Sequence, residues 1–315
     1  MTATIRIRPA EEIVTRGGEE APRVRLPEKD LFSTRARRLR QLAEGHALGD
    51  YLKFIALLAD AQQAELDQFS GVPIPTPEQL QQANEHGMPP LNAQHHQRDR
   101  LWCDMLRHML RKIADQTDGK VRETALRLEG ERDELYEAQA SKLLAGIMFG
   151  LDRATAPFIG AGLQVYFTHL TRALGEKAIP PLDVGTVCPC CGQGPTASVA
   201  RIGTGEGGHR YLHCSLCGTE WNMVRIKCTH CEATEKIEYQ SLDDGKPGTQ
   251  HAVKAETCGD CGSYLKIMYQ ERDPLVDPVA DDLATLPLDI LVTEELGKQS
   301  NGVNLMLIHG DPGDN

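Results

Sequence analysis

The sequence predicts an α+β protein of several domains, in which an irregular all-α helical domain precedes two tandem metal modules of the rubredoxin-like or zinc-ribbon-like kind. Two observations carry this prediction. Apolar residues recur at helical spacing from about 29 to 180, whereas nine of the ten cysteines lie between 188 and 261. A chain of 315 residues is long enough for about two domains, so each pattern is assigned to its own part of the chain.

Residues 1–28 are predicted to form a flexible N-terminal segment. They contain no apolar run of the signal-peptide kind, and the Arg37-Arg38 pair is not followed by the apolar run of a twin-arginine signal. No part of the chain approaches the ~18 apolar residues that a membrane-spanning helix needs. Because it shows neither an export signal nor a membrane span, the chain is expected to be a cytoplasmic protein, and its net charge of −11 favours solubility.

The helical domain is predicted to span 29–182. Apolar stripes at helical spacing lie within 48–69, 101–113 and 143–149, and a last helix is expected over 155–174. Large and sulfur-containing side chains fall on these stripes and are expected to fill the core, among them Trp102, Cys103 and the methionines.

Three polar features lie outside the stripes. The Pro- and Gln-rich stretch 72–97 is expected to be a long connection with one short helix, which begins at Thr76-Pro77 because a capping residue there precedes a proline. The His95-His96 pair is expected to be solvated. A run of arginines is expected to form an exposed helix face: Arg35, Arg37, Arg38 and Arg40.

After residue 181 the chain changes to short β-prone segments and four C-x-x-C pairs. Each pair places two sulfurs on one tight turn, so two pairs complete a tetrahedral shell of four thiolates. The pairs are separated by 22, 10 and 26 residues, counting 192–213, 218–227 and 232–257. Both long gaps can hold a β-hairpin, which returns the chain to its starting end and brings the second pair beside the first.

The short gap, 218–227, contains no turn signal after its first residue and is expected to be a strand. A strand of that length spans on the order of 30 Å, so the pairs at its ends belong to different metal sites. The predicted ligands of the first site are Cys188, Cys191, Cys214 and Cys217, and those of the second are Cys228, Cys231, Cys258 and Cys261. The corresponding modules are 183–226 and 227–274, followed over 275–315 by a helical segment, broken at Pro287, and a tail.

In three pairs a glycine follows the second cysteine. Gly192, Gly218 and Gly262 suit a turn that needs a positive φ, whereas Glu232 breaks this pattern in the third pair. Cys190 is an extra thiol inside the first pair. It is interpreted either as an inert neighbour or as a spare ligand or redox-sensitive group.

The composition and motifs exclude several functions. Four thiolates leave no open position on a metal ion, and no catalytic motif is present, so the chain is not expected to be an enzyme. From 183 to 275 there are nine Lys and Arg against twelve Asp and Glu, which disfavours nucleic-acid binding. Four histidines near the pairs are expected to lie around the ligands or in solvent: His209, His213, His230 and His251.

Several segments taken together resemble a known family. The runs CPCCGQGPTASV, RYLHCSLCGTEW, KAETCGDCGSYLKI and DPVADDLATLPLDIL closely resemble the formate dehydrogenase accessory protein family, FdhE, over roughly 185–290. The resemblance implies a cytoplasmic, non-catalytic maturation factor. Such a factor contacts the catalytic subunit of formate dehydrogenase before its export, and whether it forms a homodimer stays open.

The resemblance also bears on the metal. It implies rubredoxin-type iron at all four pairs, with zinc as the alternative in one or both sites. Two other functions remain as alternatives, a rubredoxin-like redox carrier or sensor and a zinc-ribbon protein that binds nucleic acid.

Overall fold

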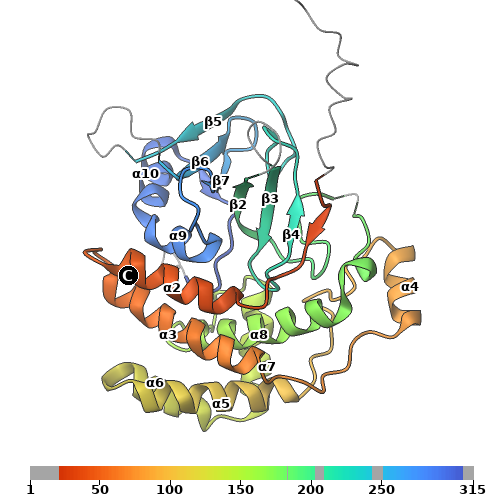
Figure 1. The fold of residues 1–315 in the computed structure, drawn as a ribbon, viewed down its shortest axis with the longest axis vertical. Helices are drawn as coiled ribbons and strands as arrows, with labels where there is room; N and C mark the ends of the chain where they lie inside the picture. Colours follow the sequence, from red (N-terminus) through yellow and green to blue (C-terminus); the bar gives the residue numbers. More distant parts are fainter. Residues whose placement is uncertain (1–20, 183, 203–208, 243–250, 308–315) are drawn as a thin grey trace, which may run out of the picture.

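Figure 1 shows a computed structural model of the chain, in which a layer of helices lies below a β-sheet. The structure describes residues 21–182, 184–202, 209–242 and 251–307. The helical layer consists of α2 (Leu31–Ala43), α3 (Gly49–Leu66), α4 (Pro77–Glu85), α5 (Leu101–Gln116), α6 (Gly119–Glu129), α7 (Asp133–Leu144), α8 (Ala156–Leu174) and the single-turn helix η1 (Glu176–Ala178). This arrangement agrees with the predicted all-α first part.

Helix α8 is the central helix of this layer. Most of its residues are buried, because α3, α5 and α7 pack around it on one side and the cysteine-bearing loops lie on the other. Gly162 lets α5 approach closely, since a Cβ there would lie 3.1 Å from Leu106 Cδ1. The helix ends at Gly175, whose φ is +79°. The helix predicted over 155–174 is confirmed.

The short helix α4 begins where the sequence predicts. Thr76 caps it and Pro77 is its first residue, and Thr76 and Gln79 form a reciprocal capping box. The core expectations for Trp102 and Cys103 are also confirmed, because both side chains are buried. Of the histidine pair expected to be solvated, His95 is exposed, but His96 is half-buried because its Nε2 lies 3.2 Å from the hydroxyl of Tyr166.

The strand-rich part forms one sheet of eight strands, with the order β1-β4-β3-β2-β7-β6-β5 and β8 beside β7. The two predicted hairpins are present as antiparallel pairs, β2 with β3 and β5 with β6. Strands β2 and β7 run parallel, with Ser198 opposite Ile267, and so join both modules into a single sheet. The strands are β1 (Val24–Arg25), β2 (Pro195–Arg201), β3 (His209–Cys214), β4 (Glu220–Asn222), β5 (Ile237–Gln240), β6 (Val253–Cys258), β7 (Ser263–Tyr269) and β8 (Gln299–Ser300).

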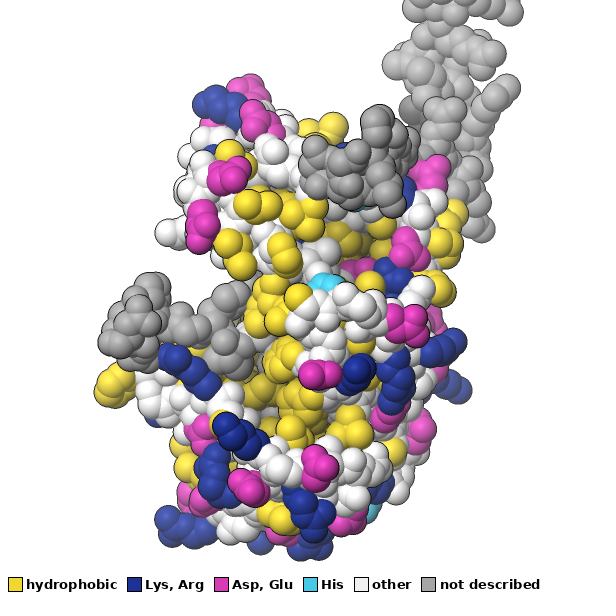
Figure 2. Space-filling view, turned by 90° about the vertical axis from the view of Figure 1, so that its left-hand side faces the viewer, with side chains coloured by type: hydrophobic (Ala, Val, Ile, Leu, Met, Phe, Trp, Pro, Cys, Tyr) yellow, Lys and Arg dark blue, Asp and Glu magenta, His cyan; other side chains and the backbone are white. Residues whose placement is uncertain are grey.

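Two C-terminal helices, α9 (Pro278–Ala284) and α10 (Leu286–Leu296), cover one face of the sheet. Leu288 and Val292 of α10 pack against Tyr264, and the helices are separate because Pro287 lies in the first turn of α10. The outer side of α10 carries apolar side chains. Figure 2 shows such side chains gathered on this face of the molecule, and the exposed ones on α10 are Ile290, Leu291 and Leu296.

Residues 21–28 differ from the flexible segment expected over 1–28. Strand β1 pairs with β4, placing Val24 opposite Trp221. Arg23 donates hydrogen bonds to the carbonyls of Ile179 and Pro180, at 2.5 and 3.0 Å. Pairing with the edge of the sheet therefore orders residues 21–28. The polar composition of this segment does not indicate such ordering. Residues 1–20 lie outside the described residues.

The arginine run is a second correction. Arg35 and Arg38 are buried rather than exposed, because both meet aspartates at the start of α9. Arg38 makes a bidentate pair with Asp281, at 2.6 and 2.9 Å, and Arg35 Nε lies 3.1 Å from Asp277 Oδ1. These pairs attach α2 to the C-terminal part of the chain.

Candidate metal centres

The first cysteine cluster is built from two turns, and in each a glycine with a positive φ, Gly192 or Gly218, follows the second cysteine. After Cys188 the chain turns so that Gly192 N donates to Cys188 O at 2.8 Å, and Gly192 has a φ of +76°. The second turn follows β3, and there Cys217 N donates to the sulfur of Cys214 at 3.4 Å. Backbone N–H groups that point at sulfur stabilise thiolate charge, so this second turn is suited to metal binding.

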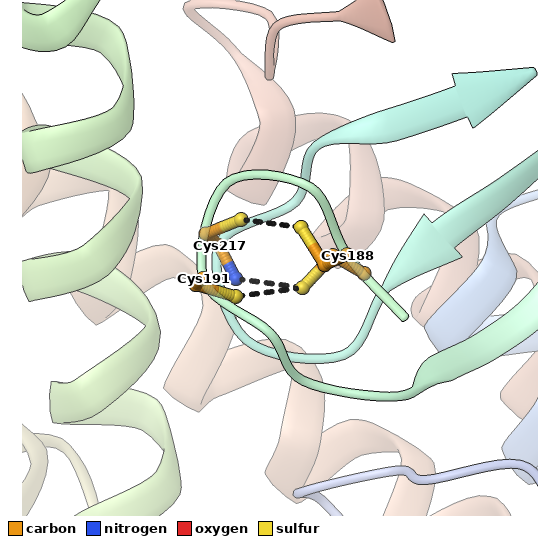
Figure 3. A group of neighbouring side chains, drawn as sticks. Cys188, Cys191 and Cys217 are labelled. Atoms are coloured by element: carbon orange, nitrogen blue, oxygen red, sulfur yellow. Dashed lines mark hydrogen bonds between the residues drawn. The ribbon is translucent and has the colours of Figure 1, made fainter. Parts of the chain in front are cut away.

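The sulfurs of this cluster face one another (Figure 3). Cys188 Sγ lies 3.6 Å from Cys217 Sγ, and Cys191 Sγ lies 3.4 Å from Cys214 Sγ. All four sulfurs lie within 4.8 Å of one another. The structure thus brings together the four residues that the sequence assigns to the first site.

The second cluster has the same composition but a different setting. Cys228 Sγ lies 3.7 Å from Cys261 Sγ, and Cys231 Sγ lies 3.8 Å from Cys258 Sγ. These four sulfurs also lie within 4.8 Å of one another. They are again the four residues that the spacing assigns to one site, although their role as ligands stays a prediction.

The spacing of the sulfurs fits a shared metal ion better than disulfides. A tetrahedral shell with metal–sulfur bonds of about 2.3 Å places neighbouring sulfurs about 3.8 Å apart. A disulfide would place them about 2.05 Å apart. The observed distances of 3.4–3.8 Å are therefore close to those of a four-thiolate shell in both clusters.

Burial in the first cluster disfavours the charged thiolate form of two cysteines. Burial raises the pKa of the Cys188 and Cys191 thiols well above the ordinary value. A bound metal ion would offset this penalty, because it stabilises the thiolate directly. Four sulfur donors within 4.8 Å of one another are a set that fits a soft divalent metal.

Helix α8 and the connection between α4 and α5 contact the first cluster from the helical layer. Gln164 Nε2 donates to Ser215 O at 2.8 Å, and the Thr168 hydroxyl donates to Cys217 O at 3.4 Å. From the loop after α4, Leu91 N and Ala93 N donate to the carbonyls of Cys190 and Cys191, each at 2.9 Å. Sequence patterns did not point to these contacts, since their partners lie tens of residues away.

A hydroxyl group accompanies one sulfur in each cluster. The Thr219 hydroxyl lies 3.1 Å from Cys217 Sγ, and the Ser263 hydroxyl lies 2.9 Å from Cys261 Sγ. Both residues follow a C-x-x-C-G run, so the signal was visible in the sequence as a hydroxyl residue after the glycine. These hydroxyl residues thus have a role beside the clusters, because such a hydroxyl can donate to a thiolate.

The segment between the clusters corrects one expectation. Strand β4 covers only Glu220–Asn222, and residues 223–227 are not a strand. The reason is Arg210, whose guanidinium donates to Lys227 O at 3.1 Å and to Glu256 at 2.7 Å. Residues 223–227, called the bridge below, therefore bend instead of continuing the strand, and Ile226 has a φ of +55°.

The extra thiol and the nearby histidines do not join either cluster. Cys190 is buried, and its sulfur lies 3.2 Å from the Thr171 hydroxyl. A hydrogen bond to Cys217 and burial raise its pKa, which favours the inert interpretation. His213 is buried with its Nδ1 3.6 Å from Glu220 Oε1, beyond hydrogen-bond distance.

Comparisons with known proteins identify the family. Models described as FdhE, N-terminal, FdhE, central domain, and FdhE, C-terminal domain match residues 21–183, 187–225 and 226–307. The chain belongs to the FdhE family. The central and C-terminal FdhE models meet at residue 226, inside the bridge between the two clusters.

Named relatives support this assignment over the whole length. The chain is 38% identical to Protein FdhE of Salmonella typhimurium and 39% identical to that of Salmonella enteritidis PT4. Each match spans 313 residues, 98% of this chain and 99% of the relative. The crystal structure of the FdhE protein from Pseudomonas aeruginosa superposes with a TM-score of 0.82 at 39% identity, covering 92% of this chain and all of that one. Among the described residues, no helix is long and apolar enough to cross a membrane.

Proposed function

We propose that this protein is a non-catalytic, cytoplasmic maturation factor that binds the catalytic subunit of formate dehydrogenase before that enzyme is complete. The observation that carries the proposal is the pair of closed four-cysteine clusters in a chain of the FdhE family. Each cluster uses all four ligand positions of a tetrahedral ion for protein sulfur, so substrate has no position on the metal. The clusters then serve to fix the turns that carry them.

The proposed metal is iron in both clusters, held by Cys188, Cys191, Cys214 and Cys217 in the first and by Cys228, Cys231, Cys258 and Cys261 in the second. A ferrous or ferric ion bound this way supplies charge that keeps four thiolates together, and it can also accept or donate one electron. The cysteine geometry suits zinc equally, so the preference for iron rests on the resemblance to the family.

Protein purified without oxygen provides the test of the metal. We expect about two iron atoms per chain and an absorption spectrum with thiolate-to-iron bands. Zinc in either cluster would contradict the assignment of iron to that site. Reversible loss of the thiolate-to-iron absorption on reduction, with turnover by a reductase, would instead favour the redox-carrier alternative.

Capture of the catalytic subunit tests the function itself. Tagged protein should retain that subunit from extracts of cells that synthesise formate dehydrogenase, and C214S/C217S should lose both capture and support of enzyme activity. C103A is the matched control, since Cys103 is buried in the helical core far from either cluster in sequence. Failure of the wild-type protein to capture the subunit would contradict the proposal.

One exposed surface is the first candidate for the site that binds the catalytic subunit. Ile290, Leu291 and Leu296 leave an apolar area on α10 (Figure 2), and such areas on soluble proteins often bind other proteins. Polar substitutions at these three positions should reduce capture while leaving the metal content unchanged.

A further inference from the structure

The two clusters differ in their access to solvent. In the first cluster all four cysteines are at most 1% exposed, because α8 and the loop around Leu91 lie against them. In the second cluster Cys228 and Cys258 are buried, but Cys231 and Cys261 are exposed. The second cluster therefore has two cysteines, Cys231 and Cys261, at the solvent-exposed surface, whereas the first has none.

The turn that carries Cys228 and Cys231 also differs from the other three. Those turns place Gly192, Gly218 and Gly262 at φ values of +76°, +71° and +74°. The third turn places Glu232 in the same left-handed region, with a φ of +61°. A residue with a Cβ is strained there, so this turn is intrinsically the least stable of the four.

Side-chain contacts of Glu232 hold the strained turn in place. Its carboxylate accepts from Lys227 Nζ at 2.7 Å and from Gly185 N at 3.2 Å. The carbonyl of Gly185 in turn accepts from Trp221 Nε1 at 2.8 Å. The turn thus depends on two partly exposed contacts that can be broken without opening the core.

We propose that the second cluster is the metal-exchange site of the molecule, through which a soft divalent ion enters and leaves, while the first cluster retains its ion. The inference rests on the proposed metal binding and adds that the two clusters differ in how readily they exchange their ion. During exchange, a sulfur or nitrogen donor of the incoming ligand forms a bond to the metal as the bond from Cys231 or Cys261 breaks. No electron is transferred, and the released thiolate takes a proton from water.

The test uses full-length protein loaded with zinc alone and mixed with an excess of the colorimetric chelator 4-(2-pyridylazo)resorcinol. Release should occur in two phases of one equivalent each, with rates at least tenfold apart. C231S/C261S should lack the fast phase and keep the slow one. A single phase, or loss of the slow phase in this variant, would overturn the inference.

Variants of the strained turn give an independent readout. E232A removes both contacts but keeps the strain, so the fast phase should accelerate at least fivefold. E232G removes the contacts and the strain together, and it should release metal more slowly than E232A. The control is E235A, at an exposed glutamate three residues later, which should behave as wild type. Equal rates in E232A and wild type would contradict the role of Glu232.

The outcome of the zinc-release assay is independent of the capture test of the proposed function, because the assay contains no formate dehydrogenase. If both clusters release zinc at one rate, only the exchange inference fails. If the protein binds no metal at all, the metal part of the proposed function fails with it.

Discussion

Single residues connect parts of this chain that lie far apart in sequence. Arg35 and Arg38 look like part of an exposed helix face because four of the six residues from 35 to 40 are arginines. Their partners, Asp277 and Asp281, follow more than 240 positions later. No local pattern reports such a pair, so burial of these arginines could not be predicted from their own segment.

Removal of Arg38 should destabilise the protein strongly. Both members of its pair with Asp281 are buried, with 6% and 4% of their side chains exposed, so R38A leaves an unpaired buried carboxylate. The expected loss is about 3–5 kcal/mol of unfolding free energy, measured by urea denaturation. R40A is the control, because the Arg40–Asp60 pair is exposed and should contribute less than about 1 kcal/mol. Similar losses in both variants would contradict this assignment.

Glu220 should make stability depend on pH. Burial raises its pKa, but the neighbouring His213 and Arg201 outweigh that effect and lower the pKa to about 2, from an ordinary 4.5. A carboxylate with a lowered pKa stabilises the fold above pH 4.5, and this stabilisation is lost as the pH falls from 4.5 toward 2. E220Q should therefore be less stable than wild type by about 3 kcal/mol at pH 7.

The measurement is the difference in urea midpoint between wild type and E220Q at several pH values. Acid weakens thiolate–metal bonds in both proteins alike, so only the difference is informative. It should shrink as the pH is lowered below 4.5. A difference that stays constant down to pH 3 would exclude ionised Glu220 as its source.

At the scale of helices and strands, the features that depend on residues close together in the sequence were predictable. The helix start at Thr76-Pro77, the helix of 155–174 and both hairpins follow from short sequence signals. The grouping of eight cysteines into two clusters follows from those hairpins, because each one returns a pair to its partner. The bridge was not predictable, because Arg210 holds it through hydrogen bonds from another strand.

Helix α8 should act as a support for the first cluster. Gln164 is buried and connects Gln62 with Ser215 O, at 2.9 and 2.8 Å, so Q164L leaves polar groups on both sides unsatisfied. We expect a loss of about 2–3 kcal/mol in unfolding free energy and faster release of metal from the first cluster only. Unchanged release from that cluster would show that α8 does not support it.

At the scale of the whole molecule, one core and one sheet connect the assigned domains. Buried residues from α3, α5 and α8 pack in the same cluster as Cys188, Cys214 and Trp221. The parallel pairing of β2 with β7 joins the two metal modules. The sequence indicates the two kinds of structure but not this continuity, which depends on contacts between segments more than 50 residues apart.

This continuity predicts that the parts do not fold independently. A fragment of residues 21–183 would lose the partners of Arg35 and Arg38 on α9, and it would expose the side of α8 that contacts the first cluster. The fragment would thereby lose the salt bridges and the apolar burial that stabilise the full chain, and a typical domain is stable by only about 5–15 kcal/mol. The fragment should therefore be digested by trypsin within minutes under conditions in which the full chain resists.

Mixing this fragment with a fragment of residues 184–315 and zinc should restore resistance, because the missing contacts form again between the two pieces. A 21–183 fragment that resists trypsin alone and unfolds cooperatively near the temperature of the full chain would contradict the prediction and establish the helical layer as an autonomous domain.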